Sequence, residues 1–98
     1  MHARHVTVKG SPEKIDEGIR SVQEQVLPVL QGCAGFKGQL LLVDRGKGEA
    51  VGISLWDSEE NMNASEEKVH QSRQATADQV GAPAPEVRLY ELPVFEIT

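Results

Sequence analysis

Arg88 and Tyr90 are the residues whose types and spacing most favour chemistry. They lie two positions apart in segment 87–92, which alternates like a strand, so their side chains should share one face of it. A guanidinium and a phenol side by side can hold a phenolate, an enolate or a carboxylate. An equally weighted interpretation is that Arg88 pairs with an acidic residue across a subunit interface, with Tyr90 packed at its rim.

His5 is the candidate general base, because an imidazole takes up and releases protons near neutral pH. It belongs to a short alternating segment, 4–8, which should neighbour segment 87–92 in a sheet. Together with Arg88 and Tyr90 it forms the predicted catalytic set, and Thr7 on the same face is a predicted ligand contact. A partly exposed strand histidine without a catalytic role is an equally good interpretation of His5.

Four further residues are predicted to contact a ligand rather than react with it: Gln39, Leu41, Ser54 and Trp56. Trp56 could stack on a flat ring, but we give more weight to its closing the end of the core ahead of the second helix. Ser54 and Gln39 could hydrogen-bond a ligand, or they could satisfy each other.

Several other kinds of site are not expected. Cys33 is the only cysteine, so there is no disulfide framework and no cysteine-based zinc site. His2 and His5 would point to opposite faces of a strand, so no metal site is expected, and no motif requires a cofactor. Ten Lys and Arg residues stand against fifteen Asp and Glu, a balance that argues against nucleic acid as a partner. There is no membrane-length apolar run and no apolar signal region, so a cytoplasmic location is the default expectation.

The first elements that position these residues can be delimited from caps and periodicity. The strand over 4–8 is followed by a helix start, where Ser11 can cap and Pro12 suits the first helical position. Four apolar residues then follow at helical spacing: Ile15, Ile19, Val22 and Val26. Pro28 should end or kink this helix.

The second half of the chain repeats the pattern. Strands over 40–43 and 51–56 are joined by a glycine-containing hairpin. Asp57 and Glu60 are spaced as a capping box for a second helix that runs to about Val80, and a strand over 87–92 follows. The order βαββαβ predicts an α+β, ferredoxin-like domain over residues 1–98, with a four-stranded antiparallel sheet and two helices on one face.

The alternation in the strands predicts which side chains lie under the helices. The apolar set expected there is Val6, Val8, Val51, Ile53, Leu55, Val87 and Leu89. The set expected on the opposite face is His5, Thr7, Gln39, Leu41, Val43, Ser54, Trp56, Arg88 and Tyr90. The second face is too apolar to remain in water. We therefore expect a homodimer in which two sheets enclose a cavity, with the apolar tail 93–98 reaching toward the partner.

One stretch carries a family resemblance. Gly35-Phe36-Lys37-Gly38, Leu40-Leu41-Leu42, the glycine hairpin and Leu55-Trp56-Asp57-Ser58-Glu59-Glu60 resemble the antibiotic biosynthesis monooxygenase superfamily. The resemblance implies a dimeric α+β barrel, and the family includes cofactor-free oxygenases of phenols and quinols as well as haem degraders. The strand-one Asn and second-helix Trp of the haem degraders have no counterpart here, nor does the strand-three Asn of the oxygenases.

Two functions are therefore predicted. The first is a protein that binds a small aromatic or quinol-type molecule in a cavity between sheet and helices or across the dimer, with cofactor-independent monooxygenation as its activity. The alternative is a non-catalytic small-molecule-binding or structural dimer module of unknown ligand.

Overall fold

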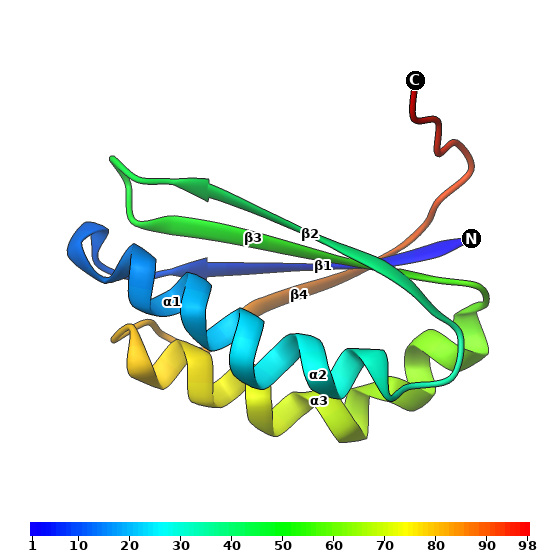
Figure 1. The fold of residues 1–98 in the computed structure, drawn as a ribbon, viewed down its shortest axis with the longest axis horizontal. Helices are drawn as coiled ribbons and strands as arrows, with labels where there is room; N and C mark the ends of the chain where they lie inside the picture. The colour runs from blue at the N-terminus through cyan, green and yellow to red at the C-terminus, as the bar shows by residue number, and fades with distance from the viewer.

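The computed structural model describes residues 1–98 and contains one antiparallel sheet. Its strands are arranged in the order β2-β3-β1-β4. Their bounds are β1 (His2–Lys9), β2 (Phe36–Asp44), β3 (Glu49–Trp56) and β4 (Glu86–Glu91). The helical segments are η1 (Pro12–Lys14), α1 (Ile15–Ser21), η2 (Val22–Val26), α2 (Leu27–Gln31) and α3 (Glu59–Gln79). All the helices lie on one face of the sheet, and the C-terminal tail rises on the other side (Figure 1). The predicted ferredoxin-like fold is confirmed.

The first helix continues past Pro28 as far as Gln31. It does so by widening into a π-helical turn, η2, over the residues just before the proline. Pro28 has no N–H to donate to the carbonyl of Glu24 four residues earlier, and a wider turn accommodates that loss. The expected side-chain cap at Ser11 is absent, because only its backbone oxygen accepts a hydrogen bond, from the N–H of Lys14 at 3.0 Å.

Helix α3 begins with a different cap from the expected Asp57–Glu60 capping box. Ser58 is the N-cap, and its hydroxyl accepts a hydrogen bond from the backbone N–H of Asn61 at 3.1 Å. The Asp57 carboxylate instead accepts from the side chain of Asn61 at 2.9 Å. The buried face of α3 is partly polar, since Ser65, Arg73 and Thr76 alternate with its apolar anchors.

The register of the sheet shows that the side chains of β2 and β3 face the opposite way from the prediction. Residues directly opposite in an antiparallel pair share a face, so Arg4, Ser54 and Gln39 lie on one side. The Arg4 side chain contacts α3, so this is the side under the helices.

The set actually under the helices in β2 and β3 is Gln39, Leu41, Val43, Ala50, Gly52, Ser54 and Trp56. The expectation that Val51, Ile53 and Leu55 lie there was wrong. Trp56 is fully buried in the core, and its placement dictates which alternate residues of β3 face inward. The predictions for β1 and β4 are confirmed, with Val6, Val8, Val87 and Leu89 on the helix side.

The tightly packed core is gathered around Trp56. It consists of Val26, Leu30, Cys33, Trp56, Met62 and Val69, with Phe36 partly buried against it. The Phe36 and Trp56 rings meet edge to face at 5.5 Å between centroids. None of the helical segments combines the length and the apolar composition that a membrane crossing requires.

Candidate functional site

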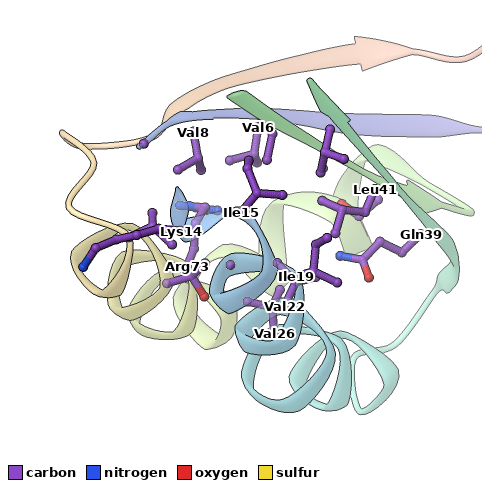
Figure 2. Close-up of a pocket in the computed structure, with 18 of the residues that line it drawn as sticks. Val6, Val8, Lys14, Ile15, Ile19, Val22, Val26, Gln39, Leu41 and Arg73 are labelled. Carbon is purple, nitrogen blue, oxygen red and sulfur yellow. The ribbon is translucent and has the colours of Figure 1, made fainter. Parts of the chain in front are cut away.

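A cavity of about 90 Å³ lies between the sheet and the helices (Figure 2). Val6 and Val8 approach it from β1, and Ile15, Ile19 and Val22 approach it from the first helix. Its lining is mostly apolar, but it contains a few polar side chains: Arg4, Ser11, Lys14, Gln39, Ser54, Arg73 and Thr76. An apolar space with few polar groups is the usual form of a small-molecule site.

Gly52 leaves a gap in the wall of this cavity. It lies in the interior of β3, directly opposite Val6 on β1 and Leu41 on β2. A Cβ atom built on Gly52 would meet no atom within 4 Å. Glycine weakens a strand interior and is often found where a ligand approaches the backbone closely. The open space at Gly52 is therefore suited to a bound molecule.

A row of three polar residues crosses the sheet beside this gap. Arg4, Ser54 and Gln39 are direct cross-strand neighbours on β1, β3 and β2. The Gln39 side chain extends from β2 into the cavity (Figure 2). The predicted ligand contacts Gln39, Leu41 and Ser54 are thus brought together here, although on the face opposite to the one expected.

Arg4 is the most deeply buried charged residue of the site, with 2% of its surface exposed. Its Nη2 donates to the carbonyl oxygen of Met62 at 2.5 Å and to the hydroxyl of Ser65 at 2.8 Å. Its Nε lies 3.6 Å from a carboxylate oxygen of Glu66. Both Nε and the remaining nitrogen, Nη1, are buried and have no hydrogen-bond partner.

A second arginine shares the same carboxylate. Arg73 is 9% exposed and donates to both oxygens of Glu66, with Nη1 to Oε1 at 3.1 Å. Burial lowers the pKa of Arg4; the charge of Glu66 opposes this shift, and the charge of Arg73 adds to it. Two buried guanidinium groups therefore face one carboxylate, and this side of the cavity carries a net positive charge.

Trp56 serves the core rather than the cavity wall. It is 0% exposed, and its Nε1 donates to the hydroxyl of Ser54 at 2.8 Å. It does not line the cavity. The surroundings of Trp56 support the interpretation that it closes the core. Its ring does not face the cavity as a wall on which a ligand could stack.

The other predicted residues lie on the outer face of the sheet, away from the helices. His5 and Tyr90 have ring centroids 6.2 Å apart in an edge arrangement. Arg88 pairs with Glu86 on its own strand, with Nη2 to Oε1 at 2.7 Å. The predicted group of His5, Thr7, Arg88 and Tyr90 therefore shares a face, but that face is separated by the sheet from Gln39, Leu41 and Ser54.

Sequence reasoning missed several residues of the cavity, of which Arg4, Gly52 and Arg73 matter most for its chemistry. A signal for Arg4 was present, because it has the same strand parity as Val6 and Val8. A charged residue on the apolar face of a strand needs partners inside the protein. Arg73 has the corresponding signal, four residues after Val69 on one face of α3.

Comparison with known sequences identifies relatives of unestablished function. Two uncharacterized proteins of Mycobacterium tuberculosis are each 39% identical, one over 92 residues and the other over 77. The matches cover 94% and 79% of this chain. They cover only 41% and 33% of the relatives, so the chain spans less than half of their length. No protein-family model matches the sequence.

Comparison with solved structures identifies the fold. A monooxygenase of Streptomyces coelicolor, solved with the ligand nanaomycin D, superposes with a TM-score of 0.77 at 13% identity, over 99% of this chain and 92% of that one. An antibiotic biosynthesis monooxygenase superposes with a TM-score of 0.67 at 19% identity, over 94% and 98%. A dimeric ferredoxin-like protein from an uncultured marine organism gives 0.69 at 12% identity, over the full length of both chains.

Proposed function

We propose that this chain, which has the subunit fold of antibiotic biosynthesis monooxygenases, binds a small, mostly apolar molecule between its sheet and its helices. The observation that carries the proposal is the gap at Gly52, where a central strand has open space in place of a side chain. A well-packed core leaves no such gap without a cost in stability. A ligand that fills the gap would offset that cost.

The size of the cavity favours a ligand with a single ring. Its volume is about 90 Å³, which is smaller than the engineered apolar cavity of about 150 Å³ that holds benzene. One ring is therefore the largest body that the cavity can take, and the lining must move outward to admit it. A flat aromatic or quinol ring fits a space between two layers, with Val6 and Leu41 at its edges and the backbone of Gly52 against its face. The S. coelicolor monooxygenase of this fold, solved with nanaomycin D, supports the choice of a small-molecule ligand.

Oxygenation of the bound ring without a cofactor is the second candidate function, favoured by the monooxygenases that share the fold. Such a reaction needs a group that takes up the proton of the ring hydroxyl. No histidine, carboxylate, tyrosine or cysteine lines the cavity. Binding is therefore the function that the cavity supports best. Equal oxygen uptake from hydroquinone by the wild-type chain and a cavity-filled variant would exclude oxygenation here.

The outer face of the sheet supports the proposal of a homodimer. Leu40, Leu42 and Tyr90 on this face are each more than 40% exposed, and no helix covers them (Figure 1). Phe95 of the tail lines a groove on the same face, while Val94 and Ile97 are 71% and 81% exposed. A second copy that packs sheet to sheet would bury this apolar surface. The dimeric ferredoxin-like protein of similar fold supports this arrangement.

The test of ligand binding is an NMR titration of the labelled chain with hydroquinone. We expect shifts of the backbone amides of residues that line the cavity, and the loss of these shifts in Gly52→Val, which fills the gap. Val51→Leu is the matched control, because it enlarges a neighbouring side chain on the outer face. Binding to Gly52→Val with unchanged affinity would overturn the proposal.

A further inference from the structure

The polar row beside Gly52 offers hydrogen-bond donors that the protein itself does not use. Nε and Nη1 of Arg4 are buried and have no hydrogen-bond partner. Nη2 donates to Met62 and Ser65, and Nε has the charge of Glu66 at 3.6 Å, so Nη1 is the nitrogen with neither a hydrogen bond nor an ion pair. A buried donor of a charged group that has no acceptor lowers the stability of the protein, so binding of an acceptor from a ligand is favoured.

Two neutral donors lie in the same row. The Ser54 hydroxyl accepts from the Trp56 indole N–H, so its own hydrogen remains free to donate. The Gln39 amide extends into the cavity and can donate through its nitrogen (Figure 2). The three side chains that face the cavity from this row can therefore surround one acceptor oxygen with donors.

The charged residues around the cavity also favour a negatively charged ligand. Arg4 and Arg73 are both buried, and Glu66 is the carboxylate that pairs with both of them. The carboxylate is itself 42% exposed, so solvent screens part of its charge. A single negative charge inside the cavity would compensate the excess positive charge in a medium where charge interactions are strong.

We infer that the ligand is a small monoanion whose carboxylate, enolate or phenolate oxygen binds Nη1 of Arg4, with Ser54 and Gln39 as further donors. Its apolar body occupies the gap at Gly52. The polar row and the Gly52 row are two residues apart along the strands, or about 6.5–7 Å, which a one-ring oxyanion can span. This inference rests on the proposed binding function and specifies its ligand class.

The test compares benzoate with benzamide, which has the same shape and no charge. The wild-type chain should bind benzoate at least about tenfold more tightly, the usual advantage of a hydrogen bond to a charged group. Arg4→Met should remove most of that preference and leave benzamide binding unchanged. Arg4→Lys, which keeps the charge and loses Nη1, should remove part of it. Arg20→Met, on the exposed side of α1, is the control for loss of an arginine.

A second variant keeps the test valid if the Arg4 variants fail to fold. Gln39→Leu retains volume at a partly exposed position and should weaken benzoate binding about tenfold, the lower end of the range for a hydrogen bond to a charged group. Equal binding of benzoate and benzamide to the wild type, or an unchanged preference in both Arg4→Met and Gln39→Leu, would overturn the anion site alone.

The remaining outcomes separate this inference from the proposed function. If hydroquinone binds at the cavity but neither benzoate nor benzamide does, the inference fails alone. If hydroquinone does not bind either, or if Gly52→Val binds all three as the wild type does, the cavity is not the binding site and both proposals fail. If Arg88→Met removes benzoate binding while Arg4→Met retains it, the anion site lies on the outer face of the sheet, and the inference is wrong.

Discussion

The guanidinium carbon of Arg4 lies 5.5 Å from the centroid of the Trp56 ring, and both side chains are buried. The aromatic face offers the cation an attraction that replaces part of its lost hydration. Met62 and Ser65 satisfy one end of the guanidinium, and Glu66 supplies the opposite charge. The packed core and the polar side of the cavity therefore meet at this contact, and changes in one should affect the other.

Ser54 links the packed core to the polar side of the cavity, because its hydroxyl accepts a hydrogen bond from the Trp56 indole N–H at 2.8 Å. Ser54→Ala leaves a buried N–H without an acceptor, so we expect the free energy of unfolding to fall by about 1–3 kcal/mol. Urea denaturation at fixed protein concentration, followed by the fluorescence of the single tryptophan, measures this. Ser72→Ala on α3 is the control and should change stability much less. Equal stability of the two variants would show that the indole finds another acceptor.

Gly52 and Gly48 should respond in opposite ways to the same substitution. Gly52→Val adds a β-branched side chain to a strand where its Cβ meets nothing within 4 Å, so we expect about 1 kcal/mol of added stability. Gly48→Val should destabilise, because φ is +70° there and a Cβ would collide with the backbone oxygen of Gly10. Thermal unfolding of both variants checks the pair. A destabilised Gly52→Val would mean that the cavity is closed in solution.

The proposed dimer can be tested with two leucines of nearly equal exposure. Leu42 is 51% exposed on the outer face, and Leu89 is 52% exposed on the side of β4 that faces the helices. Leu42→Glu places a charge in the proposed interface and should shift the protein to monomer at micromolar concentration. Leu89→Glu should leave the dimer intact. Light scattering coupled to size exclusion gives the masses, and a monomeric wild-type chain would eliminate the sheet-to-sheet arrangement.

The order of the elements could be predicted from the sequence because its signals are local. The Ser58 cap region, the glycine hairpin and the alternation of β1 and β4 each act within a few residues. The inward face of β3 could not be predicted in this way. Val51, Ile53 and Leu55 are as apolar as a core face, but the burial of Trp56 selects the alternate residues. When both faces of a sheet carry apolar residues, alternation no longer distinguishes them.

The candidate site was harder to predict because its key contacts are distant in sequence. Arg4 is held by Ser65, 61 residues further along the chain, and no pattern near Arg4 identifies that partner. Arg88 pairs with Glu86 on its own strand, and its pairing with an acidic residue across a subunit interface stays a prediction. Strand parity correctly placed Gln39, Leu41 and Ser54 on one face of the sheet. Only the tertiary packing determines that this is the face under the helices.

The shared carboxylate of Glu66 should make stability depend on acid pH. Burial raises the pKa of Glu66. The hydrogen bond from Arg73 and the charges of Arg73 and Arg4 together lower this pKa by more than burial raises it, so the pKa in the folded chain is below the ordinary value. The stabilisation is therefore complete above the unfolded-state pKa, about 4.3, and is lost as pH falls through the lower folded-state value.

Glu66→Gln should consequently be less stable than the wild type at pH 7 and should lose less stability between pH 5 and pH 3. Chemical denaturation at a series of pH values measures both effects. Glu67→Gln, at the exposed neighbouring position, is the control and should follow the wild-type profile. If Glu66→Gln kept the same slope as the wild type, the two arginines would be compensated by some group other than Glu66, and the net positive charge assigned to the cavity would have to be revised.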